Sequence, residues 1–318
     1  MKSVMNIVFF GSSQFAVPSL KALFASGHKI CSVVTQPDRE KGRGLHLSST
    51  PIKTLAKSAG LNLYQPISIN TRESIDFLKG PSPDLFVVIA YGQILSQEVI
   101  DIPKIFCINA HASLLPKYRG AAPINWAIIN GDKSTGVTII KITREMDAGE
   151  ILSKEELAIL GSDTVITLED RLSELAAELT IDSIKCIENR NYNLIPQGTK
   201  GISFAHKLKK QDGLIDWNKT AEEIHNLIRG CLTWPGAFTY YKGKLLKIYR
   251  VDLASNEEGV SFKVGEITEV SDDGITLSCG KGNLIIKELQ IEGKRRMSVR
   301  EFIAGHKISV GEMLGDKK

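Results

Sequence analysis

Short apolar runs alternate with helix-like stretches through the first 190 residues, and this alternation limits the possible folds more than any other feature of the sequence. Four of the runs are typical of strands buried on both faces: Asn6–Phe10, Ile30–Thr35, Leu85–Ala90 and Ile105–Asn109. Helical spacing lies between them, over Ala16–Ser26, Thr50–Ala59, Thr71–Lys79 and Ala122–Asn130. This order predicts βαβ units and a mostly parallel sheet.

Two later strands complete this first region. Gly136–Thr143 and Ile151–Leu160 face each other across Arg144–Glu150, which predicts an antiparallel hairpin with a long loop. Asp163–Ile187 then predicts one long amphipathic helix, with Asp163 at its N-cap. We therefore expect residues 1–189 to form an α/β domain with a Rossmann-like sheet.

The rest of the chain has a different pattern. Residues 190–210 are polar, contain Pro196, Gly198 and Gly201 and have little periodicity, which predicts a linker. Beyond it, a helix near Ala221–Arg229 precedes several short strands. The turn signals between these strands are Lys242-Gly243, Asp272-Asp273-Gly274 and Gly280-Lys281-Gly282. Their even spacing predicts a small OB-like β-barrel domain over residues 211–318.

Several missing patterns narrow the class of protein. The five cysteines contain no C-x-x-C, so we expect reduced thiols and no metal site. The segment Phe10–Phe15 lacks G-x-G-x-x-G, so NAD is not expected as a cofactor. No run approaches the roughly 18 apolar residues that span a bilayer, and the apolar run near the N-terminus is short, so we expect no signal peptide. We expect a cytoplasmic monomer with no membrane partner.

All of the excess of positive over negative charge lies in the C-terminal part. Residues 191–318 hold 20 of the 40 Lys and Arg residues but only 16 of the 36 Asp and Glu residues, whereas residues 1–190 hold 20 of each kind. A basic region beside a neutral one favours a polyanionic partner. An excess of four charges also arises by chance in an ordinary solvated surface.

The stretch Asn109–Pro123 carries the strongest chemical signal. Asn109 and His111 lie two residues apart, so in an extended segment both side chains point to one side. An amide can donate to a developing oxyanion, and a His can donate or move a proton. Asp147, in the loop between the two late strands, is the candidate carboxylate for stabilising the charged imidazole. The alternative is a turn Asn, a satisfied loop His and a capping Asp.

This stretch also resembles a known family. Asn109-Ala110-His111-Ala112-Ser113-Leu114-Leu115-Pro116 is similar to the signature of the formyltransferases that use 10-formyltetrahydrofolate, and Asp147 stands where that family places its acid. The likeness extends to members that act on initiator methionyl-tRNA and covers nearly the whole chain. It includes residues 35–39, 42–44, 88–92, 118–124, 136–138, 212–217 and 234–236.

The resemblance implies a reaction and a role for each site residue. The formyl group of 10-formyltetrahydrofolate, a co-substrate, would pass to the α-amine of methionine on initiator methionyl-tRNA, for translation initiation. Asn109 would hold the formyl oxygen, His111 would stabilise the tetrahedral intermediate, and Asp147 would tune His111 and assist proton removal through water. The implied folate-binding residues are Ser113, Leu114, Leu115 and Pro116, with backbone near Val88, Ile89, Ala90 and Tyr91.

Two basic segments are the candidate tRNA contacts. Residues 37–49 contain Arg43 between two glycines, which predicts a flexible hairpin with a cation at its tip. By composition alone this is a solvated loop, but in the family the corresponding loop enters the tRNA acceptor stem. The resemblance therefore implies RNA contacts at Arg39, Lys41 and Arg43, and the charge pattern adds Lys207, Lys209 and Lys210.

The chain departs from the family at several positions. It has Ala112 where the family usually has Gly, Ala110 where Val is frequent and Glu150 where Asp is frequent. If position 112 needs a positive φ, Ala would be strained by about 1 kcal/mol or more. Alternative functions remain open at this point: formyl transfer to a small amine or a nucleotide sugar, release of formate by hydrolysis, or RNA binding by an inactive enzyme fold.

Overall fold

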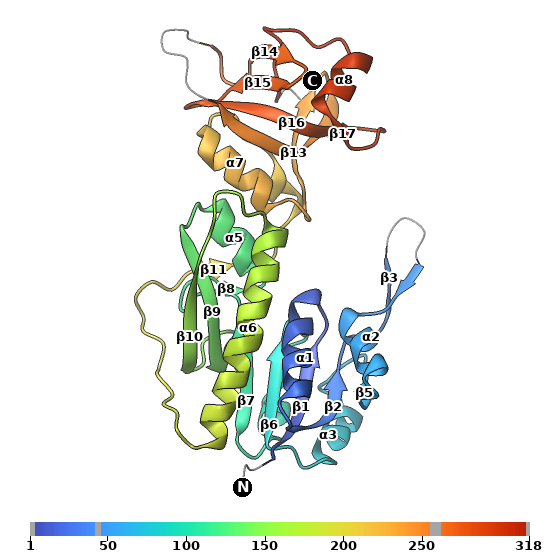
Figure 1. Cartoon of the computed structure of the whole chain (residues 1–318), viewed down its shortest axis with the longest axis vertical. Coiled ribbons are helices and arrows are strands. Elements are labelled where there is room, and N and C mark those ends of the chain that lie inside the picture. The colour runs from blue at the N-terminus through green and yellow to red at the C-terminus, as the bar shows by residue number, and fades with distance from the viewer. Residues whose placement is uncertain (1–3, 42–45, 255–261, 316–318) are drawn as a thin grey trace. The chain divides into compact units, whose positions relative to one another are not determined.

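The computed structural model describes residues 4–41, 46–254 and 262–315 (Figure 1). Contacts divide the chain into two compact units. The first unit contains Met1–Pro123, Ser134–Ala158 and Glu169–Ala205. The second contains Ile124–Lys133, Ile159–Leu168 and His206–Lys318. Each unit has its own large sheet.

A seven-stranded sheet in the order β10-β9-β7-β6-β1-β2-β5 forms the centre of the first unit (Figure 1). Neighbouring strands from β7 to β5 pair in parallel, while β9 runs antiparallel to both β7 and β10. The predicted parallel sheet and late hairpin are therefore confirmed. The strands are β1 Asn6–Gly11, β2 Lys29–Val34, β5 Leu63–Tyr64, β6 Leu85–Ile89, β7 Phe106–His111, β9 Ser134–Lys141 and β10 Ile151–Ala158.

The helices lie close to their predicted ranges. Two begin at threonine N-caps: the hydroxyls of Thr50 and Thr71 accept hydrogen bonds from backbone N–H groups of the first turn. Helices α1 and α6 lie side by side (Figure 1), and residues of both line a shared surface groove. The helical elements are η1 Gln14–Ala16, α1 Val17–Ala25, α2 Pro51–Ser58, α3 Arg72–Lys79, α4 Gln97–Ile100, α5 Pro123–Ile129 and α6 Val165–Glu188.

The N-cap predicted for α6 is wrong by one residue. The helix begins at Val165, and the hydroxyl of Thr164 accepts a hydrogen bond from Thr167 N at 3.4 Å. The Asp163 carboxylate instead accepts from Leu160 N at 2.7 Å and from the Thr167 hydroxyl at 3.1 Å. Asp163 therefore fixes the turn before the helix. No described helix is long and apolar enough to cross a membrane.

Apolar side chains bury the strands of the parallel sheet on both faces. One core cluster joins Val8, Phe10, Phe86 and Val88 of the strands to residues of α3 and α4. The intervening side chains of β1, Ile7 and Phe9, are also fully buried. Burial on both faces explains why these strands appear in the sequence as continuous apolar runs without alternation.

The second unit is built on an antiparallel sheet in the order β12-β13-β16-β15-β14, with β17 paired to β16. The C-terminal segment connects its two outer strands: Gly315 N donates to Tyr240 O of β12, and Leu314 N donates to Gly265 O, just before β14. The predicted antiparallel strands are therefore present, and the C-terminal segment lies along both outer strands of their sheet. The elements are η2 Lys210–Gly213, α7 Ala221–Gly230, β12 Ala237–Tyr241, β13 Lys244–Ala254, β14 Ile267–Ser271, β15 Gly274–Ser278, β16 Asn283–Ile291, β17 Met297–Ser298 and α8 Val299–Gly305.

The segment expected to be a linker carries more structure than its composition predicts. Strand β11 (Phe204–Ala205) pairs in parallel with β8 (Arg119–Gly120). Further back, Ile195 exchanges two backbone hydrogen bonds with Ile151 at the start of β10. The part of the expected linker up to Ala205 therefore belongs to the first unit. Its side chains can contribute to the site in that unit.

Candidate active site

The carboxyl ends of the parallel strands bring the candidate residues to one edge of the sheet. Ser12 follows β1, Gln36 lies just beyond β2, Tyr91 follows β6 and His111 ends β7. Ligands of open α/β sheets bind in the crevice outside these strand ends. Hydrogen bonds connect the segments that follow β1, β2 and β6. The Ser12 hydroxyl donates to Tyr91 O at 2.9 Å, and Gln36 Nε2 donates to the same oxygen at 3.3 Å.

Asn109 and His111 lie within β7, which extends two residues further than predicted. Their register partners on β9 are Ile140 and Thr138. Two residues apart in one strand, both side chains project from the same face of the sheet. Asn109 is half-buried, and within the part of the chain that the structure describes its amide makes no hydrogen bond to protein. The amide donors of Asn109 are therefore available to a ligand.

His111 is held between two acceptors. Its Nε2 lies 2.9 Å from the carbonyl oxygen of Tyr118, and its Nδ1 lies 3.5 Å from Oδ2 of Asp147. The ring is buried, with 6% of the residue exposed. Hydrogen on Nε2 donates to the carbonyl, while a proton on Nδ1 faces the carboxylate. The carboxylate thus contacts the imidazole directly, in the arrangement that orients a His used in acid–base chemistry.

Asp147 is fixed by groups from distant parts of the chain. Gly120 N donates to its Oδ2 at 2.9 Å, and Gln197 Nε2 donates to its backbone oxygen at 2.8 Å. The backbone of Asp147 has a φ of +51°, which non-glycine residues adopt at some cost. The contacts from residues 120 and 197 are what keep the carboxylate beside His111.

Residues 113–116 form a compact turn directly after β7. Thr138 holds the turn, because its hydroxyl donates to Ser113 O at 2.6 Å and accepts from Leu115 N at 3.1 Å. The Ser113 hydroxyl donates to Lys117 O at 2.6 Å. Ser113 and Leu115 are buried, and Leu114 and Pro116 are half-buried. The turn therefore offers a ligand mainly backbone and the half-buried side chains.

Close approach explains Gly136 opposite this turn. A Cβ at position 136 would lie 2.1 Å from Glu155 O and 2.6 Å from Cδ2 of Leu114. Only glycine lets β9 pass so near both groups. The tight fit shows why residues 136–138 share in shaping the site.

The end of β6 supplies exposed backbone. Ala90 has a φ of +46° and is exposed, and its carbonyl accepts from Ser12 N at 3.2 Å. Val88, Ile89 and Tyr91 are buried. Burial raises the pKa of the Tyr91 hydroxyl, and its ring packs edge-on against Phe10 in the core. At this strand end, backbone and not the Tyr91 side chain faces the sheet edge.

The family departures cause little disturbance. Ala112 is buried and is not among the residues with positive φ, so its methyl group carries no backbone strain. Ala110 is buried in β7. The Glu150 carboxylate lies 3.6 Å from the Lys141 ammonium, at the edge of the loop that carries Asp147.

The structure describes some but not all of the candidate RNA-contact residues. Residues 39–41 and 46–48 pair as the antiparallel strands β3 and β4, as predicted for a hairpin, while Arg43 lies outside the described residues. Lys41 is placed by its backbone only. Arg39 is exposed, and its Nη2 donates to Gln36 Oε1 at 2.8 Å. In the second unit, Lys207, Lys209 and Lys210 are all exposed.

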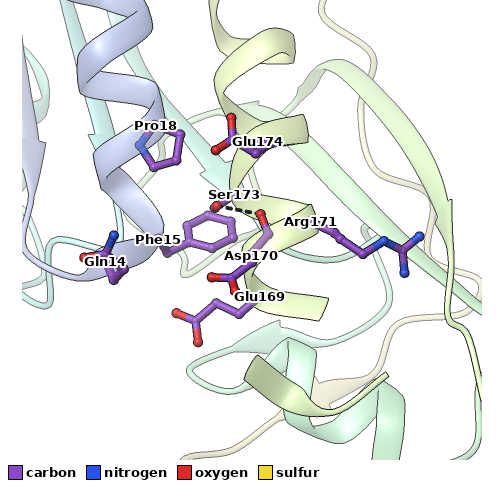
Figure 2. A pocket seen from close by; sticks show the side chains of 8 residues that line it. All are labelled: Gln14, Phe15, Pro18, Glu169, Asp170, Arg171, Ser173 and Glu174. Atoms are coloured by element: carbon purple, nitrogen blue, oxygen red, sulfur yellow. Dashed lines mark hydrogen bonds between the residues drawn. The ribbon is translucent and has the colours of Figure 1, made fainter. Parts of the chain in front are cut away.

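A separate cavity of about 300 Å³ lies between the start of α1 and the first turns of α6 (Figure 2). Phe15 and Pro18 form one wall, and Glu169 and Glu174 lie on the other. Burial and the nearby charge of Asp170 raise the pKa of Glu169. None of the predicted site residues lines this cavity.

Several groups that shape the site were not predicted to do so. Tyr118 O and Gly120 N act through the backbone, which side-chain type does not reveal. Gln197 lies in the polar segment interpreted as a linker. The sequence signal for Tyr118 and Gly120 was the resemblance to the formyltransferase family over residues 118–124.

Comparison with known proteins identifies the family. The model described as "Formyl transferase" matches residues 5–184, and the one described as "Formyl transferase, C-terminal domain" matches residues 207–307. The chain belongs to the formyl transferase family. Its mixed α/β first unit and antiparallel second unit have the architecture of formyltransferases.

Curated relatives extend the match to the whole chain. A protein of Acetivibrio thermocellus named methionyl-tRNA formyltransferase is 45% identical over 311 residues, which cover 98% of this chain and 100% of that protein. A protein of Citrifermentans bemidjiense with the same name is 45% identical and is covered to 97% of its length.

Solved structures share the fold at lower identity. The N-formyltransferase from Helicobacter canadensis, solved with folinic acid and dTDP-3-aminofucose, has a TM-score of 0.67 and 21% identity, covering 89% of this chain and 98% of that one. HypX from Aquifex aeolicus, solved with tetrahydrofolic acid, has a TM-score of 0.65 and 16% identity, covering 95% of this chain and 47% of that one.

Proposed function

We propose that the protein transfers the formyl group of 10-formyltetrahydrofolate to the α-amine of methionine on initiator methionyl-tRNA. The observation that carries this proposal is the 45% identity to proteins named methionyl-tRNA formyltransferase over 98% of the chain. The His111–Asp147 contact supports it, because formyl transfer needs a group that stabilises the negative charge on the oxygen of a tetrahedral intermediate.

The proposed reaction is an acyl transfer with the amine as nucleophile. The amine nitrogen attacks the formyl carbon, a new C–N bond forms, and the carbonyl oxygen becomes an oxyanion. Collapse of this intermediate breaks the bond to N10 of the folate. The amine loses one proton and N10 gains one, so no water is consumed and no enzyme nucleophile is needed.

Each member of the trio has one task in this scheme. The Asn109 amide donates to the formyl oxygen as negative charge develops on it. The protonated form of His111 stabilises that charge, and Asp147 orients and stabilises the imidazolium. Residues 113–116 and the backbone of residues 88–91 hold the folate. Preorganised donors of this kind are worth about 3–4 kcal/mol each in acyl transfer.

We assign tRNA binding to the hairpin that carries Arg39, Lys41 and Arg43 and to a second domain over residues 211–318, with Lys207, Lys209 and Lys210 in the connecting segment. Exposed cations track phosphates without reading sequence. A tRNA substrate fits the cytoplasmic location expected from the sequence, and a monomeric state is part of the same proposal.

The test offers the purified protein 10-formyltetrahydrofolate together with initiator methionyl-tRNA, an amino sugar nucleotide or a free amino acid. We expect formyl-methionyl-tRNA to form with a kcat/KM far above that for the other amines. Preferred transfer to the sugar or the free amine would contradict the tRNA assignment. Formate release without any amine would indicate a hydrolase.

A further inference from the structure

The side-chain amide of Gln197 connects two loops of the first unit. Its Oε1 accepts from Arg119 Nε at 3.1 Å and from Arg119 Nη2 at 2.8 Å. Its Nε2 donates to Asp147 O and to Gly149 O, both at 2.8 Å. An amide has two acceptor and two donor positions, so all four are used. The reversed orientation would set oxygen against two carbonyls, so this network allows one orientation only.

The Asp147 loop has few hydrogen bonds of its own. Within Arg144–Glu150, Ala148 N donates to Glu145 O at 3.4 Å, near the limit of a hydrogen bond. Glu145 and Met146 are exposed. A left-handed residue such as Asp147 costs about 1–2 kcal/mol and needs support from outside. Gln197 supplies that support through two carbonyls on either side of Ala148.

The same contact anchors the loop that carries Gly120. Arg119 is buried, with 7% of the residue exposed, and it directly precedes the N–H that binds the Asp147 carboxylate. Gln197 therefore fixes the backbone of Asp147 on one side and the donor of its carboxylate on the other. Gln197 thus adds a third connection between two loops far apart in the sequence, beside the Gly120 N–Asp147 hydrogen bond and the ion pair of Arg119 with Glu145, whose Nη1 and Oε1 lie 3.6 Å apart.

We propose that Gln197 is a positioning residue for formyl transfer: it holds Asp147 at the distance from His111 that the reaction needs. Gln197 acts through the backbone of the Asp147 loop and not on the substrate. The inference rests on the proposed function, because it requires the Asp147–His111 pair to take part in the reaction.

Two substitutions distinguish a role of Gln197 in holding the Asp147 loop from a role in holding Arg119 alone. In Gln197→Ala, the backbone of the Asp147 loop loses its two amide contacts while the Gly120–Asp147 hydrogen bond and the Arg119–Glu145 ion pair can still form. We expect kcat to fall tenfold or more while KM for formyl-folate and for tRNA changes less than twofold. Gln197→Glu keeps an acceptor for Arg119 but sets carboxylate oxygens against two carbonyls. Its kcat should fall as well. A Glu variant with wild-type kcat would overturn the proposal, because holding Arg119 would then be the whole role.

A double-mutant cycle tests whether the effect passes through Asp147. In an Asp147→Asn background, Gln197→Ala should lower kcat less than twofold, because there is little left to position. A full tenfold loss in that background would show an independent structural effect and overturn the inference. The matched control is Thr199→Ala, an exposed residue two positions along the same segment. It should behave as wild type in activity and in unfolding midpoint.

The wild-type protein distinguishes failure of this inference from failure of the proposed function. If wild type formylates methionyl-tRNA and the Gln197 variants do so equally fast, only the positioning role is wrong. If wild type formylates another amine instead, the double-mutant cycle of Gln197→Ala and Asp147→Asn is measured with that amine. Its outcome then decides the role of Gln197 whether or not tRNA is the substrate. If wild type transfers formyl to no amine, both proposals fail.

Discussion

The loop that carries Asp147 differs from the segment that carries Lys207 and Lys209 and enters η2 at Lys210 in how firmly its side chains are held. Asp147 is tied by hydrogen bonds to residues 120 and 197 and contacts a buried His. The three lysines are exposed, and their side chains make no hydrogen bond or ion pair to the residues that the structure describes.

The difference follows from what each region is proposed to do. Stabilising a transition state needs atoms held within a fraction of an ångström, so the surrounding structure must restrain them. Neutralising phosphates needs charge near a backbone and tolerates long, flexible side chains. Changes in the first region should therefore alter kcat, and changes in the second should alter binding and its salt dependence.

The largest effect is expected from the proposed catalytic pair, His111 and Asp147. His111→Ala and Asp147→Asn should each lower kcat by about 10²–10⁴-fold, the range for losing acid–base assistance. Single-turnover formylation measures this, and a filter-binding assay measures tRNA affinity, which should stay within twofold of wild type. If either variant lost tRNA affinity and kept kcat, the division between the two regions would be wrong.

Gly120→Ala should act on the same pair from a distance. Gly120 has a φ of +122°, and a Cβ would lie 2.7 Å from Ala205 O. The strain of about 1–3 kcal/mol should lower the free energy of unfolding and move Gly120 N away from Asp147, with a loss of about tenfold in kcat. Urea denaturation and steady-state kinetics measure the two effects.

Gly198→Ala is the matched control for this change. A Cβ at position 198 meets nothing within 4 Å, and its φ is not in the left-handed region. Stability and kcat should match wild type. Equal losses in both variants would mean that the close approach of residues 120 and 205 is not the cause.

Replacing Lys207, Lys209 and Lys210 together by Ala should weaken tRNA binding at constant kcat. Each lost phosphate contact should reduce the slope of log affinity against log salt by about 0.7–0.9, or roughly two to three for the triple variant. Binding titrations at several salt concentrations measure this slope. Lys57→Ala, an exposed lysine on α2, serves as control, and an unchanged slope in the triple variant would remove these residues from the RNA contacts.

The smallest effect concerns stability of the second unit in acid. Burial disfavours the charged form of Glu312, but hydrogen bonds from the Tyr241 hydroxyl and the Lys242 ammonium outweigh it and hold its pKa below the usual value. A carboxyl group with a lowered pKa stabilises the fold above its unfolded pKa, and that stability is lost as the pH falls.

Glu312→Gln should therefore be modestly less stable than wild type at about pH 6, with the difference shrinking toward about pH 3. Thermal unfolding at a series of pH values measures it, and kcat at neutral pH should not change. A constant difference across this range would mean that the Glu312 charge does not contribute.

The positions of the strands along the chain and the placement of Asn109 and His111 on one side of a strand could be predicted, because both depend on local patterns. Runs buried on both faces are apolar throughout, and a spacing of two in a strand puts side chains on one side. Asp147 was also proposed from the sequence, through its place in a loop between two strands and through the family likeness.

Gln197 could not be predicted, because its partners are 78 and 50 positions away in the chain and two of them are backbone carbonyls. Its segment is polar and without periodicity, which describes a linker equally well. The N-cap of α6 was misplaced for a related reason: Asp and Thr both cap helices, and contacts with Leu160 and Thr167 decided which of them did so.

The sequence by itself therefore determined the two kinds of sheet, the strand that presents Asn109 and His111, and the family. The tertiary structure alone decided which groups lie around Asp147 and His111 and that residues 190–205, expected to be part of a linker, belong to the first unit. The physical reason is that apolar periodicity is a local property, whereas a hydrogen bond between distant segments exists only after the chain has folded.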